Sequence, residues 1–130
     1  MIAISGASGV IYGVEMLRAL RGTDCPAHLI LSESAGRNLQ IEMDLTVSEV
    51  REMADVVYSN KDMAASVSSG SFRTRGMVVA PCSIKTLSGI ANSYNDNLIT
   101  RAADVSLKER RRLVLMVRET PLHKGHLDLM

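Results

Sequence analysis

The sequence predicts an α/β fold, in which one doubly wound domain spans residues 1–130 around a mostly parallel sheet. Three observations lead to this prediction. Short apolar segments alternate with segments of helical periodicity along the chain. The apolar segments are continuous, as in parallel strands that are buried on both faces. Finally, no repeat or linker divides the 130 residues, a length typical of one domain.

The predicted elements alternate in type. Strands are predicted at four short apolar segments, residues 1–4, 27–31, 77–80 and 113–117. Helices are predicted at five longer segments, residues 9–21, 32–39, 48–56, 83–91 and 98–111. In the first helix, Val10, Val14 and Leu17 recur at i, i+4 and i+7. Ser48 is the expected N-cap of the third helix, and Pro81 is expected to end the third strand.

The connecting segments are small or polar. Residues 64–71 (AASVSSGS) are predicted to form a loop, and residues 92–97 a polar break between two helices. The helix after this break is charged and amphipathic, so one of its faces is expected to be solvated.

The composition excludes several functional classes. A net charge of +1 and only 3% aromatic residues argue against nucleic-acid binding. No apolar run is long enough to span a membrane, and no basic segment followed by an apolar one suggests a signal peptide. Cys25 and Cys82 fit a reduced, cytoplasmic protein, and without a nearby histidine they make a poor zinc site.

Ligands of doubly wound folds bind beyond the carboxyl ends of the strands. Four small or polar segments follow predicted strands and are expected to converge on one crevice there, namely residues 5–9 (SGASG), 32–34 (SES), 81–86 (PCSIKT) and 118–120 (RET).

The glycine turn from Gly6 to Gly9 joins the first strand to the first helix. Its small residues let a ligand approach the backbone, and the helix amides favour a phosphate, to which Ser8 could add a hydroxyl. The turn matches neither the dinucleotide fingerprint nor a P-loop. A phosphate site and a simple tight turn are therefore both open.

A second anion site is predicted at Ser83 to Thr86, where two hydroxyls stand at a helix start. Capping by Ser83 alone is the alternative. Arg101 and Lys108 are seven residues apart, so they share a helix face and could hold another phosphate. An ordinary solvated face is the alternative, and the arginines at 110–112 are expected to belong to it.

Two carboxylates are candidate proton carriers. Glu119 follows Arg118 at the end of a buried strand, where it is expected to face the crevice. Glu42 is the second candidate, although its spacing also fits a surface carboxylate. The three histidines form no triad or metal motif, and His28 is expected to be structural within its strand.

Four sequence blocks together resemble the UbiX-like flavin prenyltransferases, a family whose members include proteins associated with aromatic-acid decarboxylases. These blocks are SGASGVIYGVEML, SSGSFRT, GMVVAPCSIKTLSGIA and RAADVSLKERRRLVLMVRETPLH. The resemblance implies a flavodoxin-like, Rossmann-like domain assembled into a homododecamer. Family members continue beyond the point where this sequence ends, so the C-terminal part of the family fold is expected to be absent.

The resemblance also implies ligands and site residues. FMN is implied to contact Gly6, Ala7, Ser8, Ser32, Ser83, Ile84, Lys85, Thr86 and Arg118. The phosphate of dimethylallyl phosphate is implied to contact Ser69, Arg101, Lys108 and Glu119. In this family N5 of reduced FMN takes the dimethylallyl group, phosphate leaves, and a bond to C6 closes a fourth ring.

No metal is required in the family, so protein cations stabilise the departing phosphate. Glu119 is implied to pass protons between phosphate and flavin, with Ser8 and Glu42 in support. The product is the cofactor of UbiD-like decarboxylases. One alternative is a non-catalytic FMN-binding accessory protein of an aromatic-acid decarboxylase, and a second is a flavodoxin-like redox protein. Direct decarboxylation is the least favoured, because FMN offers no evident route to loss of CO2.

Overall fold

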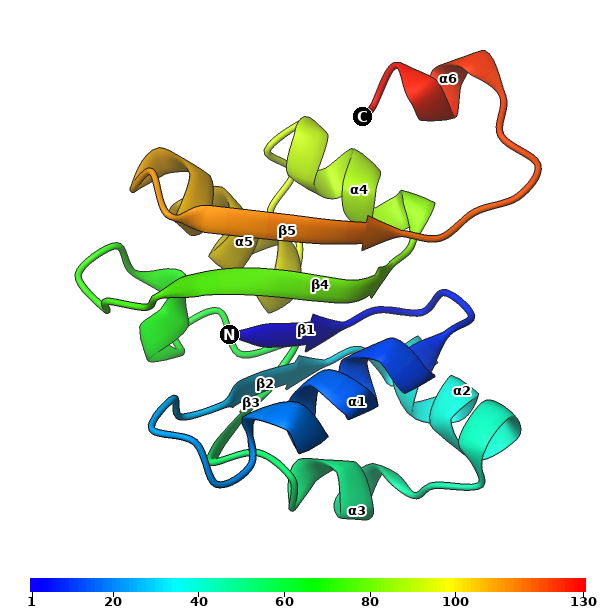
Figure 1. Cartoon of the computed structure of the whole chain (residues 1–130). Coiled ribbons are helices and arrows are strands. Elements are labelled where there is room, and N and C mark those ends of the chain that lie inside the picture. Colours follow the sequence, from blue (N-terminus) through cyan, green and yellow to red (C-terminus); the bar gives the residue numbers. More distant parts are fainter.

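The computed structural model describes residues 1–130 and contains one five-stranded sheet in the order β3-β2-β1-β4-β5 (Figure 1). All of its strand pairs are parallel. The strands are β1 (Ile2–Ile4), β2 (His28–Leu31), β3 (Val56–Ser59), β4 (Gly76–Cys82) and β5 (Arg112–Val117). The predicted doubly wound α/β fold is therefore confirmed.

Helices cover both faces of this sheet. They are α1 (Val10–Leu20), α2 (Glu33–Met43), α3 (Val47–Arg51), α4 (Ile84–Ala91), α5 (Leu98–Lys108) and the short α6 (Lys124–Leu127). Figure 1 shows α1, α2 and α3 on one side and α4 and α5 on the other. No helix combines the length and apolar character that crossing a lipid bilayer requires.

Two cores result from the alternation of side chains along each strand. On β1, Ile2 and Ile4 pack with Val10, Val14 and other residues of the α1 layer. Ala3, between them, belongs to the opposite core, which contains residues of α4 and α5. Because both faces of β1 are covered, its sequence is continuously apolar.

The third helix is shorter than the predicted 48–56, so its predicted extent is wrong. It ends at Arg51, and its cap is Thr46 instead of Ser48, with Glu49 completing a capping box. Residues 56–59 form β3, which pairs with β2 at the edge of the sheet. Tertiary pairing outweighs the helical pattern here, since Asp55 already bonds through its backbone and carboxylate to Ala27.

Two further boundaries differ from the prediction. Strand β4 continues through Pro81 to Cys82 because sheet contacts there use carbonyl oxygens: Pro81 O accepts from Ser5 N, and Cys82 O accepts from Arg118 N. Helix α5 ends at Lys108 and not at residue 111. The left-handed φ of 55° at Arg110 turns the chain toward β5.

The other predicted elements are confirmed within a few residues. Ser83 caps α4, and residues 92–97 separate α4 from α5. The loop predicted at 64–71 also contains one short 3-10 turn, Ser66–Ser68. His28 lies in β2 as expected, where Nδ1 is 2.9 Å from the Tyr58 hydroxyl and the ring packs edge-on against Phe72.

Acidification is expected to destabilise the protein through His28. Burial, together with the nearby N-terminal amine, lowers the pKa of His28 below its usual 6.5. The unfolded chain therefore binds the proton first, so stability is full above pH 6.5 and declines as the pH falls below it. Urea unfolding at pH 7.5 and 5.0 should show a larger loss for the wild-type chain than for His28→Gln. Equal losses would contradict this assignment.

Candidate functional site

A cleft of about 920 Å³ lies beyond the carboxyl ends of the strands. Its walls come from the turns after β1, β2, β3 and β4 and from the segment between α4 and α5. The lining residues are Gly6, Ser32, Glu33, Ser34, Asn60, Lys61, Ser83, Lys85, Thr86, Ser88, Gly89, Asn92, Tyr94, Asp96, Asn97 and Ile99. The cleft thus lies where the strand order reverses between β1 and β4, as ligand sites of this fold class do.

The close approach of two turns shapes this cleft. A Cβ on Gly6 would overlap the Cβ of Ser34, so only glycine allows the turn after β1 to lie against the start of α2. Buried Ser5 joins the ends of β1 and β4. Its hydroxyl donates to Pro81 O and accepts from Ser83 N, both at 2.8 Å.

Replacing Ser5 by alanine is expected to lower the free energy of unfolding by about 2 kcal/mol, because it leaves the Ser83 amide without its acceptor. The turn that bears Ser83 and Thr86 should also loosen, so ligand binding in the cleft should weaken. Urea unfolding measures the first effect. Ser48→Ala is a matched control, because the exposed Ser48 side chain forms no hydrogen bond. Equal stability of the two variants would show that the Ser5 bridge contributes nothing.

Two helix N-termini open toward the cleft. Ser83 caps α4 by accepting from Thr86 N at 3.3 Å, and its hydroxyl donates to Thr86 Oγ1 at 3.1 Å. Ser32 caps α2 in the same way, accepting from Ala35 N at 3.1 Å. Capping by Ser83, proposed from sequence as the alternative to an anion site, is therefore present. It leaves the first amides of α4 without an acceptor, so the cap and an anion site are compatible.

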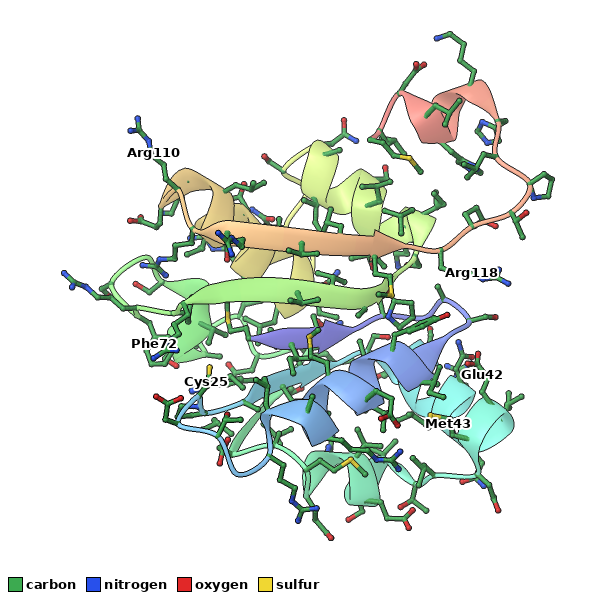
Figure 2. All side chains as sticks on the ribbon, in the orientation of Figure 1. Cys25, Glu42, Met43, Phe72, Arg110 and Arg118 are labelled. Atoms are coloured by element: carbon green, nitrogen blue, oxygen red, sulfur yellow. The ribbon has the colours of Figure 1, made fainter.

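The N-terminus of α1 has a different partner. One carboxylate oxygen of Glu42 accepts from Gly9 N at 2.8 Å and from Val10 N at 3.1 Å. Figure 2 shows Glu42 on α2, beside the turn that leads into α1. The amides expected to face a phosphate therefore hold a carboxylate of the same chain. Although Glu42 is exposed, it is a ligand of the glycine turn and not a free surface group.

The structure brings together five of the residues predicted to contact a cofactor. Gly6, Ser32, Ser83, Lys85 and Thr86 all line the cleft. Three other predicted cofactor residues are not among those that line the cleft. Ala7 is buried, and its carbonyl oxygen accepts from Asn38 Nδ2 at 3.1 Å. Ser8 is exposed on the same turn, and Ile84 is half-buried at the start of α4.

The fourth predicted segment does not line the cleft. Arg118 and Glu119 are exposed beyond β5, and the Glu119 carboxylate accepts from Thr120 N at 3.0 Å. The expected convergence of four segments is therefore wrong for this one. The segments that follow β1 to β4 line the cleft, whereas residues 118–120 run on exposed beyond β5.

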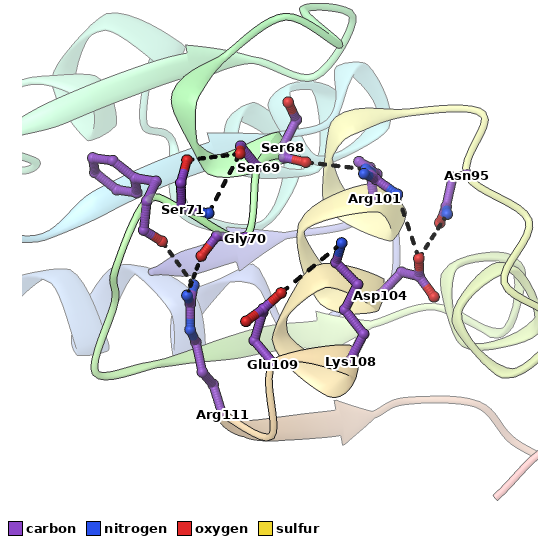
Figure 3. Close-up of polar contacts among 11 residues, drawn as sticks. Ser68, Ser69, Gly70, Ser71, Asn95, Arg101, Asp104, Lys108, Glu109 and Arg111 are labelled. Carbon is purple, nitrogen blue, oxygen red and sulfur yellow. Dashed lines mark hydrogen bonds and ion pairs between the residues drawn. The ribbon is translucent and has the colours of Figure 1, made fainter.

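The predicted phosphate-binding residues divide into two groups. Ser69, Arg101 and Lys108 belong to a cluster of polar contacts between the 66–72 loop and α5, which we call the α5 cluster (Figure 3). Glu119 lies beyond the other end of β5 (Figure 2 labels its neighbour Arg118). The six residues of β5 span about 20 Å at 3.3 Å per residue, with Lys108 before the start of the strand and Glu119 beyond its end. Lys108 and Glu119 of one chain therefore cannot contact the same phosphate.

Specific contacts hold the cations of the α5 cluster. Arg101 Nε donates to Ser68 O at 3.1 Å, and its Nη1 lies 3.6 Å from Asp104, which also accepts from Asn95. Lys108 Nζ is 3.9 Å from the Glu109 carboxylate. Arg101 is therefore half-buried and ordered, and not part of a simple solvated face.

Sequence reasoning missed the cleft residues that follow β3 and α4. Asn60 and Lys61 come directly after β3, and Asn60 also accepts from the first amides of α5. Tyr94, Asp96 and Asn97 belong to the polar break. Recognising the β-branched pair Val56-Val57 as an edge strand would have placed Asn60 and Lys61 at the carboxyl edge. Nowhere do three His, Cys, Asp or Glu side chains gather as a metal ion would require.

Comparison with known proteins agrees with this geometry. The Flavoprotein family model matches residues 1–127. The chain is 61% identical to the flavin prenyltransferase UbiX of Escherichia coli K12 over 131 residues, covering all of this chain and 69% of that protein. It is 55% identical to the flavin prenyltransferase UbiX of Thauera aromatica, covering all of this chain and 67% of that protein.

Solved structures give the same result. A crystal structure of AnUbiX in complex with FMN and dimethylallyl pyrophosphate superposes with a TM-score of 0.97 at 51% identity, covering 99% of this chain and 69% of that one. A dodecameric FMN-dependent UbiX-like decarboxylase from Escherichia coli O157:H7 also gives 0.97, at 46% identity, covering 98% and 70%. The peptidyl-cysteine decarboxylase EpiD, at 20% identity and a TM-score of 0.71, shares the fold alone.

Proposed function

Because this chain belongs to the UbiX-like flavin prenyltransferases, we propose that it joins the dimethylallyl group of dimethylallyl phosphate to reduced FMN. The observation that carries this function is the cleft between β1 and β4, in a chain 51% identical to a protein solved with FMN and dimethylallyl pyrophosphate. The comparisons favour this enzyme activity over a non-catalytic accessory protein, since the relatives named above are themselves prenyltransferases.

The residues present in the cleft fit FMN. A volume of about 920 Å³ lies within the range of cofactor pockets. The free amides at the start of α4 and the hydroxyls of Ser32, Ser83 and Thr86 suit a phosphate and a polyol chain. Gly6 lets the backbone approach the ligand, and Lys85 adds a positive charge at the cleft wall.

When bound, reduced FMN would supply N5, whose bond to the dimethylallyl group forms as the carbon–oxygen bond to phosphate breaks, and C6, which would add to the double bond of that group to close the fourth ring; one phosphate would be released for each group transferred. The chain's own residues must hold FMN, orient the donor and stabilise the charge that develops on its phosphate. The cleft residues hold FMN. Arg101 and Lys108 provide cations for the departing phosphate, and Ser69 provides a hydroxyl.

We propose that these two parts come from different copies of the chain. The α5 cluster does not line the cleft of its own chain, and its Lys108 precedes the start of β5, whereas Glu119 follows the end of that strand. The Escherichia coli relative is a dodecamer. In a similar assembly of this chain, we propose that the α5 cluster of one copy lies beside the cleft of another. At this shared site Glu119 would carry protons between phosphate and flavin. Ser8 and Glu42 would support it from the glycine turn.

The further assignments follow from the family. The product is passed to a UbiD-like decarboxylase, and residues 1–130 act as one flavin-binding domain. A cytoplasmic location is supported by the two free cysteines, Cys25 and Cys82, which suit a reducing compartment.

The decisive experiment is anaerobic incubation of the purified chain with reduced FMN and dimethylallyl phosphate, followed by mass spectrometry of the extracted flavin. A mass gain of one prenyl unit that is lost in Glu119→Gln supports the transferase. The diphosphate donor, tested in parallel, identifies which phosphate ester is used. Flavin that co-purifies but stays unmodified with both donors would favour the accessory protein instead.

A further inference from the structure

Arg111 makes contacts that its position in the sequence does not suggest. It stands in a run of three arginines, for which the sequence predicts a solvated helix face. Instead it is half-buried, just beyond the end of α5. Its Nη1 donates to Phe72 O at 2.7 Å and its Nη2 to Gly70 O at 2.5 Å (Figure 3).

These two carbonyl groups belong to the 66–72 loop, which carries Ser69. The Ser69 hydroxyl lies 2.9 Å from that of Ser71. Val67 and Phe72 pack the two ends of the loop on the core, but residues 68–71 between them carry only small side chains that cannot anchor the loop by packing. Two arginines anchor its backbone instead. Arg101 holds it at Ser68 O, and Arg111 holds it on the other side of Ser69, at Gly70 O and Phe72 O.

Gly70 explains how closely the loop approaches the end of α5. A Cβ at this position would overlap the carboxylate of Glu109, which is also the ion-pair partner of Lys108. The loop, Glu109 and Arg111 are therefore packed as a unit. A shift of the loop would displace the Ser69 hydroxyl relative to Arg101 and Lys108.

We propose that Arg111 is a positioning residue, which fixes the 66–72 loop so that Ser69, Arg101 and Lys108 present one binding surface to the donor's phosphate. This inference rests on the proposed function, which assigns those three residues to the phosphate. Arg111 itself directs two of its nitrogens at backbone carbonyls. Its effect on the donor is therefore transmitted through the loop.

The guanidinium group is required because it is planar and donates from two separate nitrogens in a fixed fork. A lysine at this position could bond one of the two carbonyls with a single ammonium. Arg111→Lys should therefore retain the charge but only part of the anchoring, whereas Arg111→Met removes both. The matched control is Arg110→Met, because the Arg110 side chain projects into solvent at the same end of α5 (Figure 2) and forms no hydrogen bond or ion pair.

The test has two readouts on the FMN-loaded chain. Hydrogen–deuterium exchange of residues 66–72 reports the loop directly, without reference to activity. The KM for dimethylallyl phosphate and the kcat report its consequence, with binding of the donor by calorimetry as a measure independent of turnover. We expect faster exchange in Arg111→Met, a KM about tenfold higher, and unchanged FMN affinity. Arg111→Lys should be intermediate, and Arg110→Met should match the wild-type chain.

The outcomes separate this inference from the function on which it rests. If the wild-type chain and Arg110→Met bind and transfer no donor, the proposed function fails, and the positioning role fails with it. If the wild-type chain binds the donor and Arg111→Met binds it equally well, only the positioning role is overturned. Faster exchange in the loop without any change in KM or donor affinity overturns it too. Arg111→Lys decides the question if Arg111→Met does not fold.

Discussion

Replacing Gly13 by alanine is expected to lower the free energy of unfolding by about 2–3 kcal/mol, because the added methyl group overpacks the contact between α1 and the sheet. The new Cβ would overlap Ala80 O and lie 2.7 Å from Ile4 Cγ1. Ala80 O is a backbone atom of β4, so the clash can be relieved only by moving α1 or the strand. The helix propensity of alanine returns about 1 kcal/mol and cannot offset this.

Gly36→Ala is the matched control for this prediction. Gly36 also lies inside a helix, but its Cβ would meet only Val47 Cγ2, a methyl group at the end of a side chain, at 2.9 Å. Its stability should stay within about 1 kcal/mol of the wild-type value, because the gain in propensity offsets the contact. Urea unfolding at one protein concentration compares the two variants. Equal unfolding midpoints would mean that α1 does not pack on β4 at Gly13.

The largest expected effect on activity is that of Lys108→Met. In the proposed reaction the charge on the departing phosphate is balanced by side chains, and Lys108 is a half-exposed ammonium at the end of α5. Loss of one such group should lower kcat about 100-fold, as for other groups that stabilise charge in a transition state. The affinity for FMN should not change, because Lys108 does not line the cleft.

Lys124→Met is the control, since it removes the same charge from an exposed surface pair with Asp128 on α6. Single-turnover formation of prenylated flavin, followed by mass spectrometry, separates the chemical step from donor binding and product release. The control should keep the wild-type rate. If Lys108→Met also kept it, the α5 cluster would have no part in phosphate departure.

The division of the site between two surfaces also predicts how activity depends on assembly. The α5 cluster does not line the cleft of its own chain, so an isolated copy holds FMN without the cations that the reaction needs. Dilution that dissociates the proposed assembly should therefore abolish prenyl transfer before it abolishes FMN binding. Size-exclusion chromatography with fluorescence detection, paired with the transfer assay, would measure both. Transfer that persists in the monomer would contradict the division.

The sequence by itself determined the fold class and the glycine turn. Continuous apolar strands can be buried on both faces only if helices cover the sheet on both sides. The alternation of apolar strand segments with helical segments along the chain predicts this arrangement. Ser83 as a helix cap was also predictable, because a cap depends on local geometry, whereas the close approach of Gly6 to Ser34 depends on the fold. The carboxyl-edge rule then placed Ser32 and the 83–86 turn together.

Only the tertiary structure decided which distant groups meet. Edge strand β3 depends on pairing with β2, which local propensity cannot reveal. Glu42 reaches the α1 amides across 33 residues, and Arg111 reaches Gly70 across 41, so no spacing rule predicts either contact. The separation of Lys108 from Glu119 likewise follows from the direction of β5. Such long-range contacts are set by how the layers pack, because a side chain bonds whatever backbone group the fold brings within its reach.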